Sequence, residues 1–299
     1  MNYQAFLAAI FEEIRVRFDE EYEVSLRQIP KNNGCLFDAI SICKKGDPAA
    51  PTTYLQQLFE NFQKGQSLDE IADEVKATYH QGRDSFRLTP ALFSCPEYIR
   101  PRICFRLVSR EKNRELLESI PHILLLDLAK IYFLELGISS GEHMTSTIHF
   151  DHCRIWNLSP DELEVLANAN TPRLFPAKCF ALNHVLANLS GPALSILTNE
   201  KECFGSAAML YPGLLAHFSK EKRSDLVIFP SSIHEVLLLP DFGKTTDFAS
   251  LCEMVRSINA AEVLPTEQLS DCVYYYRATT NTICVYHENE MREIFSLDE

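Results

Sequence analysis

The sequence predicts an α+β protein in which helices pack on antiparallel sheets, with helix and strand mixed throughout. Of its 299 residues, 46% are hydrophobic and 10% are aromatic, a composition typical of a folded protein. Some segments place apolar residues at helical spacing, and others alternate apolar with polar residues as strands do. Short turns join pairs of strand-like segments near both ends of the chain, and this favours antiparallel pairing.

The N-terminal region, 1–90, is expected to form one unit with a helix, a hairpin and two further helices. The turn Asn32-Asn33-Gly34 suits a hairpin because asparagine and glycine tolerate positive φ. Ser67 and Glu70 form a capping box that opens the last helix. The expected elements are a helix from Tyr3 to Phe18, strands at Tyr22–Ile29 and Leu36–Ile42, and helices at Tyr54–Phe62 and Leu68–Tyr79.

The remainder, 91–299, is expected to form a larger α+β unit, with a further boundary near 176–191. A strong helix start lies at Ser159-Pro160-Asp161-Glu162, where a cap, a proline and an acid follow one another. Strands are expected at Ile103–Ser109, Ile123–Leu128, Ile131–Leu136, Thr145–Phe150, Ala193–Leu197, Asp225–Phe229, Val236–Leu239, Cys272–Arg277 and Thr282–Tyr286. Helices are expected at Arg110–Ser119, Ser159–Asn168, Gly205–Phe218 with a break near Pro212-Gly213, and Asp247–Ile258.

Charge and cysteine usage limit the compartment and the partners. The net charge of −13 repels phosphate backbones, which counts against nucleic acid as a general partner. Ten cysteines are spread singly without a Cys-x-x-Cys pair, which favours reduced thiols in a cytoplasmic protein over a zinc site. The N-terminus lacks a secretory pattern, and no apolar run is long enough for a bilayer. We expect no membrane association and no cofactor.

The first candidate for chemistry is Ser232, His234 and Glu235, which supply a hydroxyl, an imidazole and a carboxylate between two expected strands. A nucleophile needs a base within hydrogen-bond reach, and the base needs an orienting acid. Neighbours on a strand point to alternate faces, so Glu235 would point away from the other two. A tight turn with Ser232 bound to local backbone, and with His234 satisfied in the core, is the favoured interpretation.

The second candidate is a metal site at His149, His152 and Cys153, whose side chains suit zinc. Their spacing matches no established ligand pattern, and His-Glu-x-x-His is absent from the sequence. A surface turn with scattered imidazoles is the favoured interpretation.

Two further segments suggest anion binding. An arginine island surrounds Arg100, Arg102 and Arg106, and locally it could hold an acidic partner, a phosphate or single-stranded nucleic acid. Nearby glutamates dilute it, so a solvated face is the simpler interpretation. Asn199 and Gly205 bracket a turn whose backbone amides could face an anion, although close packing of the following helix explains the small residues equally well.

Several local runs follow one another over nearly the whole chain. They are Lys31-Asn32-Asn33-Gly34, Pro51-Thr52-Thr53-Tyr54-Leu55, Ile120-Pro121-His122, Leu126-Asp127-Leu128-Ala129, Asn170-Thr171-Pro172-Arg173-Leu174, Leu197-Thr198-Asn199, Gly205-Ser206-Ala207-Ala208, Tyr211-Pro212-Gly213, Pro230-Ser231-Ser232-Ile233-His234-Glu235-Val236 and Leu269-Ser270-Asp271-Cys272-Val273-Tyr274-Tyr275-Tyr276. Together these runs resemble a bacterial family of unknown function, catalogued as domain of unknown function 5688. The resemblance implies no activity, cofactor or catalytic residue.

Two functions follow as expectations. The absence of a correctly spaced catalytic motif favours a non-enzymatic binding or regulatory protein, whose partner would be a protein or a small anionic ligand. The alternative is a hydrolase-like enzyme that uses the Ser232/His234 region.

Overall fold

The computed structural model describes residues 1–46, 52–85, 90–139, 142–182, 194–230, 232–241, 246–287 and 290–297. They form two compact units, and neither is continuous in sequence. Unit 1 contains Met1–Lys31, Cys35–Cys95 and Gly137–Met144, and unit 2 contains Asn32–Gly34, Pro96–Leu136 and Thr145–Glu299. The expected α+β class with antiparallel sheets is confirmed.

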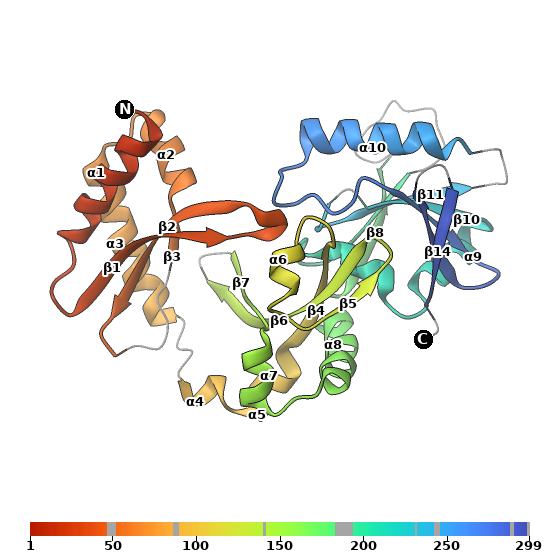
Figure 1. The fold of residues 1–299 in the computed structure, drawn as a ribbon, viewed down its shortest axis with the longest axis horizontal. Helices are drawn as coiled ribbons and strands as arrows, with labels where there is room; N and C mark the ends of the chain where they lie inside the picture. Colours follow the sequence, from red (N-terminus) through yellow and green to blue (C-terminus); the bar gives the residue numbers. More distant parts are fainter. Residues whose placement is uncertain are drawn as a thin grey trace. The chain divides into compact units, whose positions relative to one another are not determined.

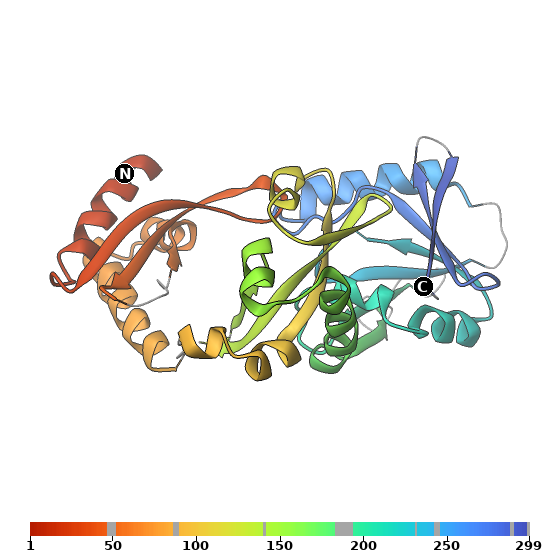
Figure 2. The ribbon, with the colours of Figure 1, turned by 60° about the horizontal axis from the view of Figure 1, so that its bottom comes forward.

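Unit 1 packs three helices on a small sheet. The sheet has the order β1-β2-β3, and β1 and β2 form the long hairpin that is plain in Figure 2. Its core joins Phe6, Ile10, Ile40, Leu55 and Ile71, which come from every one of these helices and from β2. The elements are α1 (Tyr3–Arg15), β1 (Tyr22–Pro30), β2 (Leu36–Lys44), β3 (Thr52–Tyr54), α2 (Leu55–Gln63), α3 (Leu68–Ser85) and the short α4 (Pro90–Phe93).

A four-stranded sheet forms one part of unit 2, apart from its residues within Gly137–Met144, which belong to unit 1. Its strands are β4 (Ile103–Ser109), β5 (His122–Leu125), β6 (Leu128–Ser139) and β7 (Glu142–Thr147), with β6 between β4 and β5 and with β7 also paired to β6. Helix α8 (Pro160–Leu174) packs against β4, and its Thr171 Oγ1 accepts a hydrogen bond from the Phe105 backbone at 2.9 Å. The sheet is therefore fixed to α8 through the strand that carries Arg106.

A seven-stranded antiparallel sheet forms the other part, in the order β14-β13-β12-β10-β11-β9-β8. Figure 1 draws α10 (Phe248–Glu262) across it, and Cys252 and Val255 pack there against Val227, Phe229 and Val273. The strands are β8 (Ala177–Ala181), β9 (Ser195–Asn199), β10 (Asp225–Phe229), β11 (Val236–Asp241), β12 (Val273–Arg277), β13 (Thr282–His287) and β14 (Glu290–Ser296).

The remaining elements of unit 2 are short. They are the 3₁₀ turn η1 (Asn32–Gly34), α5 (Pro96–Ile99), η2 (Arg100–Arg102), α6 (Arg114–Leu117), α7 (Phe150–Trp156), η4 (Gly205–Leu210) and α9 (Leu214–Lys222). None of the helices in the described ranges is both long and apolar enough to cross a membrane.

Several expected boundaries were wrong. The strand expected at Ile123–Leu128 ends at Leu125, because Leu126 adopts a positive φ of 55° and turns the chain into β6. The strand expected at Thr145–Phe150 ends at Thr147, since His149 caps α7. The helix expected at Arg110–Ser119 is reduced to the single turn of α6.

Asp127 connects the two sheets of unit 2. It lies in the turn between β5 and β6, and it accepts hydrogen bonds from Ser270 Oγ and Tyr274 Oη, each at 2.5 Å. Both donors are almost completely buried, with exposed fractions of 4% and 0%. Asp127 is half-buried, and a carboxylate that is partly removed from water needs such donors, so this network fixes β12 to the turn that precedes β6.

The Asn-Asn-Gly turn belongs to unit 2 through a second polar network. The Asn33 amide donates to the Pro265 and Gln268 carbonyls at 2.8 and 2.7 Å. Its backbone N–H donates to Asn113 Oδ1, and Asn113 Nδ2 donates in return to Asn33 Oδ1, both at 2.8 Å. Asn33 makes these contacts from a left-handed conformation with φ of 61°.

Candidate functional site

The loop between β9 and η4 brings several candidate residues together. At its end, Phe204 adopts a positive φ of 54°, and Glu202 adopts one of 51°. Such a conformation is costly for a side chain of this size, and it persists only where the surroundings hold it. We name Arg106, Lys201, Cys203, Phe204 and His234 the Phe204 cluster.

Asn199 holds the loop in shape. Its Oδ1 accepts hydrogen bonds from the backbone N–H groups of Lys201 at 3.0 Å and Cys203 at 3.4 Å. Its Nδ2 donates to the Cys203 carbonyl at 2.7 Å. Because one buried amide binds both sides of Cys203, the loop is rigid where it meets the cluster.

Gly205 allows two backbones to approach closely. A Cβ at this position would lie 2.2 Å from Thr198 Oγ1 and 2.4 Å from the His234 carbonyl oxygen. Thr198 Oγ1 itself donates to that carbonyl at 2.7 Å, and Ser206 Oγ donates to the Ile233 carbonyl at 2.8 Å. The lack of a side chain at Gly205 therefore positions the His234 backbone beside the loop.

The His234 ring stacks on Phe204. The ring centroids are 6.0 Å apart and the planes differ by 11°. Nδ1 accepts from the Phe204 backbone N–H at 3.4 Å, which leaves the proton of the neutral ring on Nε2. Nε2 lies 3.7 Å from Glu267 Oε1. Both ring nitrogens of His234 thus face partners other than Ser232.

Arg106 brings a positive charge to the cluster from the middle of β4. Its guanidinium carbon lies 4.5 Å from the centre of the Phe204 ring, and Nη2 donates to Thr147 Oγ1 at 3.3 Å. Nε is buried and makes no hydrogen bond. The side chain is half-buried. Burial lowers the pKa of Arg106 to about 10, and no carboxylate in the described ranges acts on it.

Lys201 and Cys203 complete the cluster. Lys201 Nζ lies 3.5 Å from Glu135 Oε1 and 4.3 Å from the centre of the Phe175 ring. Burial raises the pKa of the Cys203 thiol, while Arg106 and Lys201 act in the opposite direction. The thiol is therefore neutral at pH 7, and it provides no counter-charge for Arg106.

The structure brings together residues that the sequence suggested separately. Arg106 from the arginine island and His234 belong to the cluster, and Asn199 and Gly205 from the turn hold its loop in place. The cluster leaves out two island members. Arg100 lies 3.5 Å from Glu162, and the Arg102 guanidinium lies 4.0 Å from the centre of the Tyr98 ring. Sequence reasoning did not single out Phe204, Lys201 or Thr147, and nearness to Gly205 was the only signal for the first two.

Ser232 and His234 do not form a nucleophile–base pair through their side chains in the part of the chain that is described. Ser232 Oγ accepts from the His234 backbone N–H at 3.0 Å, as in a local turn. Glu235 is half-buried directly before β11, and Ser231 lies outside the described residues.

His149, His152 and Cys153 lie at the start of α7. His152 Nδ1 accepts from the His149 backbone N–H at 3.2 Å, and the two rings are 5.6 Å apart. Burial, and secondarily His149, lower the pKa of His152, while burial raises the pKa of the Cys153 thiol. Throughout the described ranges, no group of three His, Cys, Asp or Glu side chains could hold a metal.

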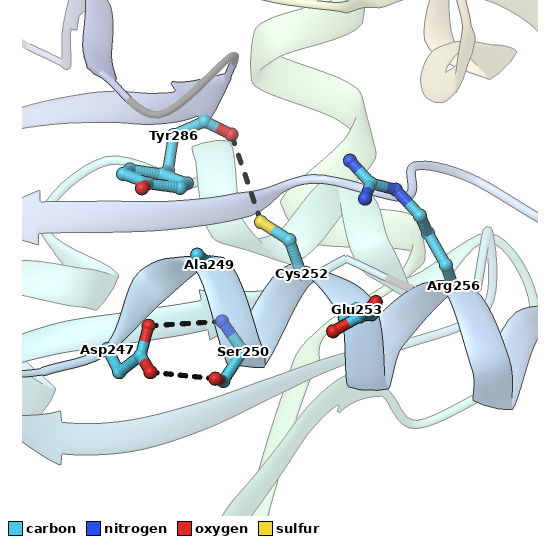
Figure 3. A pocket seen from close by; sticks show the side chains of 7 residues that line it. All are labelled: Asp247, Ala249, Ser250, Cys252, Glu253, Arg256 and Tyr286. Atoms are coloured by element: carbon cyan, nitrogen blue, oxygen red, sulfur yellow. Dashed lines mark hydrogen bonds between the residues drawn. The ribbon is translucent and has the colours of Figure 1, made fainter.

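A pocket of about 320 Å³ opens beside α10 (Figure 3). Asp247 caps the helix by accepting from Ser250, and the Cys252 thiol faces the Tyr286 carbonyl. Arg256 and Glu253 stand at the pocket with exposed side chains. None of the candidates from the sequence lines it.

Comparison with known proteins gives one match. Residues 3–278 match the model of a family of unknown function, DUF5688. No curated protein and no solved structure matches the chain.

Proposed function

The chain belongs to the family of unknown function DUF5688, and from that premise we propose a function that rests on the site alone. The protein is a non-enzymatic binding protein of the cytoplasm. It takes up an anionic group, carried by a small ligand or by a protein, at the guanidinium of Arg106.

The observation that carries this function is the uncompensated charge of Arg106. A guanidinium offers five N–H donors, and the only hydrogen bond within the described ranges goes to Thr147. Arg106 is half-buried, with its Nε fully buried, and a charge shielded from water without a counter-ion is costly unless something binds it. Carboxylate and phosphate groups fit the planar guanidinium edge-on and form strong, charge-assisted hydrogen bonds.

The rigidity of the loop adds support. Phe204 covers the guanidinium, and Asn199 fixes the backbone next to it. A ligand that meets a preformed site loses less free energy to ordering. The ten free cysteines agree with a reducing compartment.

A hydrolase that uses Ser232 and His234 has less support. The Ser232 hydroxyl is bound to backbone, and the His234 nitrogens are directed at Phe204 and Glu267. The hydrolase function stays a prediction that a Ser232→Ala variant can test against ester substrates.

Anion binding at Arg106 is testable by thermal unfolding of the full chain in increasing acetate at constant ionic strength. We expect acetate to raise the unfolding midpoint of the wild type and not that of Arg106→Met, because ligand that binds only the folded state stabilises it. Arg110→Met is the matched control, since Arg110 is exposed at the end of β4. Equal midpoint shifts in all three proteins would contradict the function.

A further inference from the structure

We propose that the group bound at Arg106 carries a single negative charge and is a carboxylate. This rests on the proposed function and specifies its ligand. The proposal concerns the carboxylate itself, whether a free acid or a protein side chain presents it.

The charges around Phe204 leave one positive charge without a counter-charge. Lys201 already faces Glu135, a side chain with an exposed fraction of 9% for the whole residue. His234 faces Glu267, so even a protonated ring has a carboxylate at 3.7 Å. Arg106 alone lacks an acidic partner among the described residues. A monoanion therefore neutralises the site, whereas a dianion would leave an excess negative charge in a partly buried place.

The geometry agrees with a planar ligand. Phe204 lies over one face of the guanidinium, so a ligand meets its edge, where the N–H groups point. A carboxylate has two oxygens in one plane and can accept two parallel N–H bonds from such an edge. The Thr147 hydroxyl accepts from Nη2 and has a proton of its own to donate to a neighbouring oxygen.

Cys203 supports the same charge count. Its thiol lies close enough for Arg106 and Lys201 to act on its pKa, yet burial dominates and keeps the thiol protonated. It therefore adds no negative charge that would compete with the ligand.

The test compares acetate with sulfate on the full-length, ¹⁵N-labelled chain at equal ionic strength. The amide shifts of Phe204 and Gly205 report binding, because both residues adjoin the guanidinium or the His234 backbone. We expect acetate to bind at least about tenfold more tightly than sulfate at this site. If sulfate binds more tightly, the single-charge assignment is wrong while anion binding at Arg106 stands. If neither anion moves these amides, the proposed function fails as well.

A variant of Glu135 tests the charge count directly. Glu135→Gln frees Lys201 and adds one positive charge near Cys203. The preference should then move toward sulfate by about tenfold, and an unchanged acetate-to-sulfate ratio would overturn the charge count. Glu202→Gln is the control, because Glu202 lies on the same loop as Lys201, is exposed and pairs with Lys178 of β8. Should Glu135→Gln fail to fold, the wild-type ratio alone still decides.

Discussion

At the residue scale, two arginines differ in whether acidic side chains pair with them. Arg17 in unit 1 is bound by Glu13, Asp69 and Asp73, and its side chain is 13% exposed. Arg106 in unit 2 has no such partner in the described ranges. The first arrangement stabilises the fold, and the second keeps a charge available for a ligand.

The contrast predicts opposite effects on stability. Arg17→Met should lower the free energy of unfolding by about 1–2 kcal/mol, since it removes three partly exposed ion pairs of modest strength. Arg106→Met should leave that free energy unchanged or raise it, because it removes a half-buried and unpaired charge. Urea unfolding in chloride buffer without carboxylates measures both. If Arg106→Met lowered the free energy of unfolding more than Arg17→Met does, the inference that Arg106 lacks a counter-charge would be wrong.

Asn33 gives a second prediction at this scale. Asn33→Gly keeps the left-handed backbone but removes hydrogen bonds to Asn113, Pro265 and Gln268. We expect a loss of roughly 2–3 kcal/mol in the stability of unit 2, at about 1 kcal/mol for each bond. Asn157→Gly is the control, since Asn157 is exposed and also left-handed, with φ of 49°. Equal effects of the two changes would show that the Asn33 side chain is unimportant.

The sequence singled out individual residues of the site, but it did not predict that they lie close together. Residue type marked Arg106, His234 and Gly205 as unusual. They come from β4, from the segment before β11 and from the start of η4, and only the sheet order brings these together. Phe204 gave no chemical signal, because an aromatic residue in an apolar chain is most often a core residue.

At the scale of elements, a buried ion pair joins α8 to the four-stranded sheet. Lys130 Nζ lies 2.6 Å from Glu164 Oε1, and Tyr132 Oη donates to Glu164 Oε2 at 2.6 Å. The two charged side chains are 8% and 25% exposed. Replacing one partner of this pair should therefore destabilise the fold far more than replacing both.

Glu164→Gln should lower the free energy of unfolding by about 3–5 kcal/mol, because it leaves the Lys130 ammonium buried without a counter-charge. Adding Lys130→Met should recover most of this loss, since glutamine can still accept from Tyr132. Urea unfolding of the single and double variants measures the coupling. A double variant no more stable than Glu164→Gln would show that the charge of Lys130 is not the cause.

The same pair predicts a dependence on pH. Burial opposes ionisation of Glu164, but hydrogen bonds from Lys130 and Tyr132 outweigh it and hold the pKa of Glu164 below its ordinary value. The resulting stability is present above the unfolded pKa of about 4.3, and it is lost as pH falls through the lower folded pKa. The stability difference between wild type and Glu164→Gln should therefore narrow between pH 7 and pH 3. If the stability difference between wild type and Glu164→Gln did not change with pH, ionisation of Glu164 would not be its cause.

Elements with strong local signals were predictable, and those set by tertiary contacts were not. The capping box Ser159/Glu162 marked the start of α8 correctly. By contrast, β3 and β14 were missed, and the end of β5 was misplaced because Leu126, a residue that rarely adopts positive φ, does so there. Pairing with neighbouring strands decides such segments, and their own sequences carry little of that information.

At the scale of the whole molecule, the units are interleaved along the chain. Asn32–Gly34 belongs with unit 2, and Gly137–Met144 belongs with unit 1. Local patterns mark breaks in the chain, such as clusters of proline and glycine. Such local patterns do not predict that the turn of a hairpin belongs to one unit while the two strands that it joins belong to the other.

The cysteines give a prediction for the whole chain. Cys179 is exposed, whereas Cys104, Cys252 and Cys284 are buried. Iodoacetamide should modify Cys179 before the three buried thiols and should reach those only on unfolding, because alkylation needs access to the sulfur. Peptide mass spectrometry over time measures the order. Early modification of Cys104 would show that the core around Phe133 and Phe175 opens readily.

Location of a bound carboxylate tests anion binding at Arg106 most directly. Crystals of the full chain soaked in 3-bromobenzoate would show the ligand through the anomalous signal of bromine. We predict a carboxylate with oxygens about 2.7–2.9 Å from the Arg106 guanidinium nitrogens, beside the ring of Phe204. Bromine found only elsewhere, for example at Arg256 in the pocket beside α10, would contradict the assignment of Arg106 as the anion-binding residue.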